Sequence, residues 1–208
     1  MDLAKLATRS TDSETISEFQ HIILNVVKPS WTFGPWVAGG CIRRLLLGEN
    51  AFASDVDVFF ASEAQKDEWV ARIQALYPEN VSLANANNVT ITVNGVLLDN
   101  KVGVLKFQAV HVQYYDSPQA VIDSFDYTIC QLVTDGVKLE TGEFTLWDLA
   151  RKRLVLHKLT YPVATMRRMI KYTRQGFYAC PGIMNDLLTQ VATRPELLNQ
   201  GIQFLYID

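Results

Sequence analysis

Residues 37–60 have the sequence VAGGCIRRLLLGENAFASDVDVFF, and this segment combines a glycine turn, a short helix and a short acidic strand. The glycine pair Gly39-Gly40 precedes a helical run over residues 41–47, which a further glycine closes. A polar loop then leads into a strand over residues 55–60. We expect the rest of the chain to be built around this turn, helix and strand.

The predicted strand carries two aspartates, Asp55 and Asp57, separated by one residue. Side chains alternate between the two faces of a strand, so both carboxylates are expected on the same face. Two adjacent carboxylates repel each other unless a cation lies between them, and Mg²⁺ (or Mn²⁺) binds carboxylate and phosphate oxygens together. We therefore predict that Asp55 and Asp57 bind divalent metal and carry catalysis.

The glycine pair suits the other half of such a site. Gly39 and Gly40 allow backbone to approach a ligand closely, and the N–H groups at the start of the following helix favour phosphate. Arg43, inside that helix, adds a guanidinium group. A triphosphate at the glycine turn and metal at the aspartates together indicate nucleotidyl transfer, with a nucleoside triphosphate such as ATP as substrate.

These motifs resemble the nucleotidyltransferase superfamily of DNA polymerase beta, and within it the head domain of tRNA CCA-adding enzymes and bacterial poly(A) polymerases. The family signature is approximately GGxVRDxLLG followed by DxD. The chain has GGCIRRLLLG over residues 39–48 and DVD over residues 55–57. Arg44 stands where the family usually has Asp, and the loop before Asp55 is slightly longer. The resemblance covers about residues 37–177.

Later segments extend the resemblance and imply further nucleotide-binding residues. SFDYTICQL over residues 124–132 corresponds to the family's RRDFTINAL, which helps to hold the incoming nucleotide. Asp126 is therefore a candidate, and the alternative is a capping residue between a helix and a strand. YPVATMRRMIKYTRQGF over residues 161–177 corresponds to DPxRxxRxxRFaxxLGF and implies Arg167 and Lys171. The acidic residues that open the family helix and help to choose CTP or ATP are missing.

The superfamily uses a third carboxylate on a later strand, which binds the catalytic metal and helps to activate the attacking hydroxyl. By order it should lie in KFQAVHVQYY, residues 106–115, which contains neither Asp nor Glu. His111 is either a weak ligand or base in that run or an ordinary strand histidine, and Asp99 or Asp116 could substitute if the strand register differs. The polar members of the run are Gln108, His111 and Gln113.

The chain has 208 residues and a net charge of −3 at pH 7, but its charges are unevenly spread. Of its 22 acidic residues, 19 lie at or before Asp148, whereas residues 149–185 contain eight Lys or Arg and no acid. Such a basic segment predicts contact with an anionic partner, here RNA such as tRNA, and the alternative is a solvated helix face. The candidate RNA-binding residues are Arg151, Lys152, Arg153, Arg168 and Arg174.

The three cysteines, Cys41, Cys130 and Cys180, lack metal-ligand spacing and are odd in number, which favours a reducing compartment. The sequence contains no recognisable signal peptide and no apolar run long enough to span a membrane. We therefore expect a cytoplasmic protein without a membrane partner. The oligomeric state is not predicted.

The order of the predicted elements is typical of the α+β class. Together with the resemblance, it predicts a nucleotidyltransferase-like small mixed β-sheet flanked by helices. A catalytic domain is expected over residues 1–145, with a basic, C-terminal helical extension over residues 146–208 packed on it. Helices are predicted over 13–27, 62–76, 117–125, 162–177, 183–191 and 195–200, and strands over 89–93, 96–98, 104–115 and 126–133, with a hairpin around Gly136.

Three functions are compatible with these patterns. The leading hypothesis is a metal-dependent nucleotidyltransferase that moves a nucleoside monophosphate from a nucleoside triphosphate to an acceptor hydroxyl on RNA. A catalytically weak or inactive member that binds nucleotide or RNA as a sensor or inhibitor is the second, and the missing third acid favours it. The third is a transferase that acts on a small molecule or a protein, for which the basic segment would not be needed.

Overall fold

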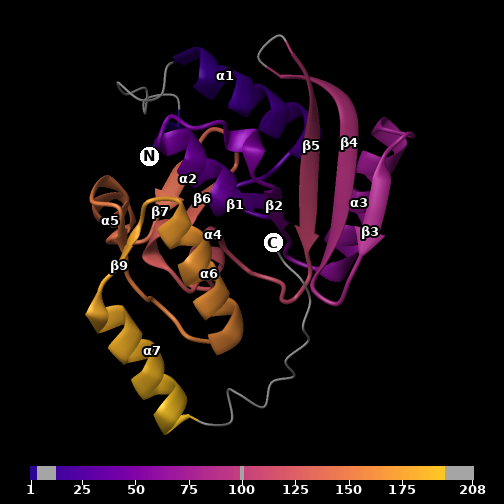
Figure 1. Ribbon diagram of the computed structural model, residues 1–208. Coiled ribbons are helices and arrows are strands. Elements are labelled where there is room, and N and C mark those ends of the chain that lie inside the picture. The colour runs from indigo at the N-terminus through magenta and orange to yellow at the C-terminus, as the bar shows by residue number, and fades with distance from the viewer. Residues whose placement is uncertain (4–12, 99–100, 195–208) are drawn as a thin grey trace. The chain divides into compact units, whose positions relative to one another are not determined.

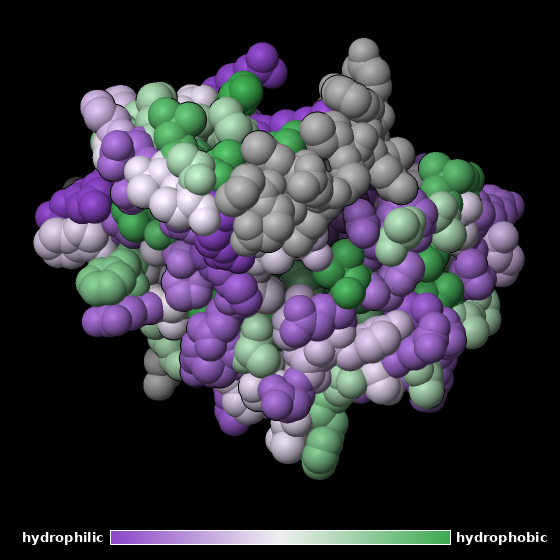
Figure 2. Space-filling model, turned by 90° about the horizontal axis from the view of Figure 1, so that it is seen from below, coloured by the Kyte–Doolittle hydropathy of each residue, from purple (hydrophilic) through white to green (hydrophobic). Residues whose placement is uncertain are grey.

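The computed structural model describes residues 1–3, 13–98 and 101–194. Within these residues the chain forms helices and one large mixed sheet, which confirms the predicted α+β class (Figure 1). None of the described helices is long and apolar enough to cross a bilayer. In the space-filling view of Figure 2, hydrophobic residues form small groups among hydrophilic ones on the face that is drawn.

The chain divides into two compact units. Unit 1 comprises residues 1–123 and 130–142, and it contains the large sheet. Unit 2 comprises residues 124–129 and the chain from residue 143 onward. The six residues 124–129 thus belong to unit 2 although unit 1 flanks them on both sides in the sequence.

The sheet of unit 1 has its described strands in the order β3-β4-β5-β2-β1-β6-β7. Neighbouring strands are antiparallel except β2 and β5, which are parallel. Strand β2 lies at the centre of this sheet, between β5 and β1. The strands are β1 (Trp36–Ala38), β2 (Val56–Phe59), β3 (Val81–Ala84), β4 (Asn88–Leu98), β5 (Lys101–Val110), β6 (Leu132–Thr134) and β7 (Leu139–Thr141).

Helices complete both units. The helices of unit 1 are α1 (Ser13–Ile22), the π-helix η2 (Ile23–Val27), α2 (Gly40–Leu46), the 3₁₀ turn η3 (Ala51–Ala53), α3 (Glu63–Leu76) and α4 (Pro118–Ile122). Unit 2 contains α5 (Thr145–Ala150), β8 (Arg153–Leu154), α6 (Pro162–Arg174), β9 (Tyr178–Ala179) and α7 (Pro181–Thr193). The helix predicted over 195–200 lies outside the described residues.

Helix α3 ties the N-terminal helices of unit 1 to the sheet through Trp69. The indole ring packs against Phe60 and Phe107, with ring centroids 5.6 Å and 5.9 Å away. Its Nε1 donates to the Val27 carbonyl at 2.9 Å, and the Arg72 guanidinium donates to the same carbonyl at 2.8 Å. The end of a helix leaves carbonyl groups without helical partners, so these two side chains satisfy the end of η2.

The strand predicted over 104–115 is wrong at its end, because β5 stops at Val110. Beyond that residue the backbone leaves the sheet and turns, and the Tyr115 N–H donates to the Phe60 carbonyl at 3.0 Å. The two strands predicted over 89–93 and 96–98 form one strand, β4, with an irregularity in its pairing around Gly95.

The strand predicted over 126–133 is also wrong in its first half. Residues 128–130 form the 3₁₀ turn η4 (Thr128–Cys130), and β6 begins only at Leu132. The reason is that Thr128, which belongs to unit 2, is hydrogen-bonded to a segment of the same unit that lies far away in the sequence. The Thr128 N–H donates to the Val155 carbonyl at 3.1 Å. The hairpin predicted around Gly136 is confirmed by the antiparallel pairing of β6 with β7.

Candidate active site

The two aspartates lie on the polar side of β2, as strand alternation predicts. Val56 and Val58 are fully buried, whereas Asp55 and Asp57 are half-buried. A hydrophobic valine faces the core on every second position, so the intervening carboxylates stay on the opposite face of the sheet. Both acidic groups are therefore kept together by the strand itself.

Strand pairing brings the glycine turn next to the aspartates. Ala38, the last residue of β1, is the register partner of Asp57, and Gly39 and Gly40 follow it directly. Gly39 has φ 81° and ψ −127°, a conformation that favours glycine, and its N–H donates to the Leu132 carbonyl at 2.9 Å. The two halves of the predicted site are thus neighbours in the sheet.

The start of α2 is closely packed. A Cβ atom on Gly40 would lie 2.9 Å from Ser54 Oγ, and Ser54 is the residue before Asp55. Cys41 is fully buried, and burial raises the pKa of its thiol, with the nearby charge of Asp57 adding to the effect. Cys41 is therefore held as a neutral thiol, which is a poor nucleophile.

Gln108 is the residue of the run 106–115, in which a third carboxylate was expected, that pairs with the aspartate strand. It lies beside Asp57 in the parallel pairing of β2 with β5, and its Nε2 donates to Asp55 Oδ2 at 2.6 Å. His111 lies just beyond β5, where its Nε2 is buried without a hydrogen-bond partner among the described residues, and Asp116 is exposed in the loop that follows. The polar residue beside the aspartates is therefore a neutral amide.

The donor set on β2 fits a hard divalent cation. Asp55 and Asp57 supply carboxylate oxygens, which Mg²⁺ prefers, and their partial exposure leaves other coordination positions to water and to substrate phosphates. Over the part of the chain that the structure describes, no cluster of three or more His, Cys, Asp or Glu could hold a metal. Asp99 lies outside the described residues.

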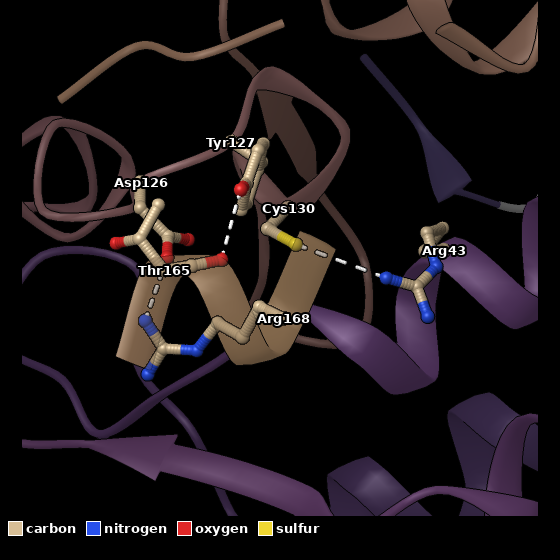
Figure 3. A network of polar contacts seen from close by, with 6 residues as sticks. All are labelled: Arg43, Asp126, Tyr127, Cys130, Thr165 and Arg168. Carbon is tan, nitrogen blue, oxygen red and sulfur yellow. Dashed lines mark hydrogen bonds and ion pairs between the residues drawn. The ribbon is translucent and has the colours of Figure 1, made fainter. Parts of the chain in front are cut away.

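Arg43 is buried inside unit 1. Its side chain is 3% exposed, and its Nη1 donates to Cys130 Sγ at 3.8 Å (Figure 3). Sequence reasoning did not foresee this contact because the two residues lie 87 positions apart. The contact of Arg43 with a triphosphate stays a prediction, and it requires the guanidinium to reach the surface from a buried position.

Asp126 is held inside unit 2 by an ion pair. Its side chain is almost fully buried, and Arg168 Nη1 lies 2.7 Å from its Oδ2 (Figure 3). The Asp126 backbone carbonyl also accepts from the N–H groups of His157 and Lys158, at 2.7 Å and 3.2 Å. Asp126 thus anchors α6 and the segment before it, and its predicted contact with nucleotide stays a prediction.

The candidate RNA-binding side chains of unit 2 differ in their surroundings. Arg151 stacks on the Trp147 ring at 3.3 Å from its centroid, and Arg153 lies 3.6 Å from the buried carboxylate of Asp148. Lys152 lies over the Phe177 ring. A separate exposed row along α6 has the spacing of one helix face and consists of Arg167, Lys171 and Arg174. The contact of Arg167 and Lys171 with nucleotide, expected from the sequence, stays a prediction.

Sequence reasoning missed Lys106, a polar residue on the same face of β5 as Gln108. The two lie two positions apart on the strand, whereas Leu105 and Phe107 are fully buried. Lys106 is exposed. The alternation in LKFQ was a sufficient signal for this, because it groups the lysine with the glutamine on one strand face.

Replacing Gly39 with Ala is expected to destabilise the protein by about 1–3 kcal/mol, because a side chain disfavours the Gly39 backbone conformation. Urea denaturation of the variant measures the loss. The exposed Gly95, which also has a positive φ of 74° but would meet no atom within 4 Å of an added Cβ, gives the matched control Gly95→Ala. Because Gly95 has a positive φ and open space around it, Gly95→Ala gives the cost of the backbone conformation alone, and a Gly39→Ala variant as stable as the parent chain would contradict the prediction.

Replacing Arg168 with Ala is expected to cost about 1–2 kcal/mol, because it leaves the buried Asp126 carboxylate without its cation while Arg168 itself is half-exposed. Chemical denaturation checks this. Lys171→Ala, at an exposed position on the same helix, is the control and should change stability by less than about 0.5 kcal/mol. Equal losses in the two variants would contradict a structural role for the ion pair.

The fold is nucleotidyltransferase-like, since it is similar to solved structures of CCA-adding enzymes. One similar solved structure is the Thermotoga maritima CCA-adding enzyme complexed with tRNA_CCA, at 18% identity and a TM-score of 0.59, covering 97% of this chain and 47% of that chain. Another is the Bacillus stearothermophilus CCA-adding enzyme in complex with CTP, at 16% identity and a TM-score of 0.54, covering 86% and 44%. At such identities the similarity establishes the fold alone.

The chain belongs to the Gabija anti-defense 2 family, whose sequence model matches residues 13–152. A similar protein is "Gabija anti-defense 2" of Bacillus phage SPbetaL7, which is 25% identical over 147 residues. The alignment covers 68% of this chain and 33% of that protein, so the chain spans about a third of the relative's length.

Proposed function

We propose that this chain is a divalent-metal-dependent nucleotidyltransferase, which moves a nucleoside monophosphate from a nucleoside triphosphate to an acceptor. The observation that carries the proposal is the pairing of Ala38 with Asp57, since it makes the glycine turn a neighbour of the two aspartates. Asp55 and Asp57 would hold Mg²⁺ or Mn²⁺, and the fit of their carboxylates to a hard cation supports this assignment.

The residues around the aspartates would act by positioning the metal-binding carboxylates and the phosphates of the substrate. The bound metal would neutralise charge on the triphosphate and on the departing pyrophosphate. Gln108 restrains the Asp55 carboxylate through its amide, so that this side chain is oriented before substrate arrives. Gly39 and Gly40 would let phosphate approach the backbone. Catalysis of this kind relies on orientation and electrostatic stabilisation more than on covalent chemistry.

RNA is the acceptor class that we propose. The exposed cationic row Arg167, Lys171 and Arg174 on α6 offers contacts for a phosphate backbone. Structures of similar fold are described as complexes with tRNA_CCA, with CTP and with ATP, which supports both nucleotide and RNA as partners. Binding through such a row should weaken steeply as salt concentration rises.

A second candidate is a catalytically weak or inactive protein that binds nucleotide or RNA as an inhibitor. The family name describes an anti-defence role, and the presence of Gln108 instead of an acidic residue beside the aspartates specifically favours this candidate. We rank it second because a protein that only binds has little use for two mutually repelling carboxylates on one strand face.

Label transfer tests the proposal. The full chain is incubated with Mg²⁺ or Mn²⁺ and each α-labelled nucleoside triphosphate, with total RNA, with a cell extract or alone. Label on RNA supports the proposed acceptor, and label on a protein or a small molecule supports transfer to a different acceptor. Triphosphate binding without any transfer would favour the inhibitor and rule out the enzyme.

A further inference from the structure

Strand β5 presents two polar side chains beside the aspartates. Gln108 is the register partner of Asp57 on β2, and Lys106 precedes it by two residues on the same strand face. Across the next pairing, Lys106 lies opposite Thr92 and Gln108 opposite Thr90 on β4. The polar face of the sheet next to the aspartates is therefore formed by an ammonium group, an amide and two hydroxyls.

Lys106 has the features of a ligand-binding side chain. It is exposed, and it forms no hydrogen bond or ion pair with any described residue. The neighbouring Gln108 donates to Asp55 through its Nε2, so its Oε1 and the Lys106 ammonium are the remaining polar groups on this face among the described side chains of β5. An ammonium beside two carboxylates and their metal is suited to a second anionic group.

Among its described residues, β5 offers no carboxylate base for a neutral acceptor. A hydroxyl must lose its proton to attack phosphorus, and at neutral pH an unactivated hydroxyl keeps that proton almost completely. The β5 position paired with Asp57 has Gln108, whose amide takes up no proton near neutral pH. A terminal phosphate, in contrast, is already largely dianionic at pH 7, because its second pKa is about 6.

We propose that the attacking group of the RNA acceptor is a terminal phosphate, which Lys106 binds beside Asp55 and Asp57. The inference rests on the proposed nucleotidyl transfer. An oxygen of the terminal phosphate forms a bond to the α-phosphorus of the nucleoside triphosphate. The bond from that phosphorus to the bridging oxygen breaks, and pyrophosphate leaves with the electron pair. The product is a phosphoanhydride, and no proton has to be removed from the dianionic acceptor.

The test compares one RNA dodecamer in three forms, with a 5′-phosphate, with a 3′-phosphate and with hydroxyls only. Binding to the full chain is measured by fluorescence anisotropy in EDTA, and transfer is measured with Mg²⁺ and α-labelled triphosphates. Lys106→Gln removes the ammonium. Lys28→Gln removes the charge of another exposed lysine of unit 1, at the end of η2, and serves as the matched control.

We expect a phosphorylated form to bind about fivefold more tightly than the hydroxyl form, and to receive at least about tenfold more label. Lys106→Gln should abolish the fivefold preference, and Lys28→Gln should leave it unchanged. Ribonuclease should not release the transferred label as a mononucleotide, because the label is held by a phosphoanhydride. A nucleotide pyrophosphatase, which cleaves that anhydride, should release it. Equal or greater labelling of the hydroxyl form overturns this inference and leaves the transferase intact. If no form of the RNA receives label and Lys106→Gln leaves binding unchanged, both this inference and the proposed nucleotidyl transfer to RNA are overturned.

Discussion

Replacing Asp55 and Asp57 together with Asn should lower nucleotidyl transfer at least about a hundredfold. The substitutions keep the shape of both side chains and remove the two charges that would hold the metal. They also replace the Asp55 carboxylate that accepts a hydrogen bond from the Gln108 side-chain amide. The strand therefore loses its negative charges but keeps polar side chains. The measurement is the initial rate of label transfer at saturating Mg²⁺ and triphosphate.

A second readout separates metal binding from activity. A ligand that binds only the folded state raises the melting temperature, so Mg²⁺ should stabilise the parent chain and not the double Asn variant. The control is Asp116→Asn, which removes an acidic group from the exposed loop after β5. If Mg²⁺ stabilises the double variant as much as the parent chain, Asp55 and Asp57 do not bind the metal.

Replacing Trp69 with Ala should destabilise the protein by about 3–5 kcal/mol, the largest loss that we expect from a single substitution. The ring is almost fully buried between Phe60 and Phe107, and its Nε1 satisfies the Val27 carbonyl. The variant loses apolar contact, leaves a cavity beneath the sheet and exposes the end of η2. The free energy of unfolding in urea measures the total.

Two further variants show how much of that loss comes from the hydrogen bond and how much any truncation in α3 would cost. Trp69→Phe keeps an aromatic ring and removes the hydrogen bond, so it should cost a smaller part of the total. Leu76→Ala truncates an exposed side chain at the end of the same helix and should cost less than about 0.5 kcal/mol. A loss in Trp69→Ala no greater than that in Leu76→Ala would show that α3 does not hold the sheet and η2 together.

Much of the candidate site could be predicted because its parts are local. The glycine turn, the helix after it and the alternating strand occupy residues 37–60, and the structure has all three within a few residues of their expected bounds. The α+β class followed from the same periodicity. Errors occurred where a segment bonds to distant backbone, as in residues 128–130, since strand periodicity carries no information about such partners.

The sequence by itself determined that two carboxylates share a strand face and that a glycine pair precedes them, because residue spacing fixes both. Only the tertiary structure decided which residues lie beside them. The amide that donates a hydrogen bond to Asp55 belongs to Gln108, 53 positions away in the sequence. The thiol that contacts Arg43 belongs to Cys130, 87 positions away. Such neighbours depend on strand order and register, which are set by the packing of the whole sheet and not by any local pattern.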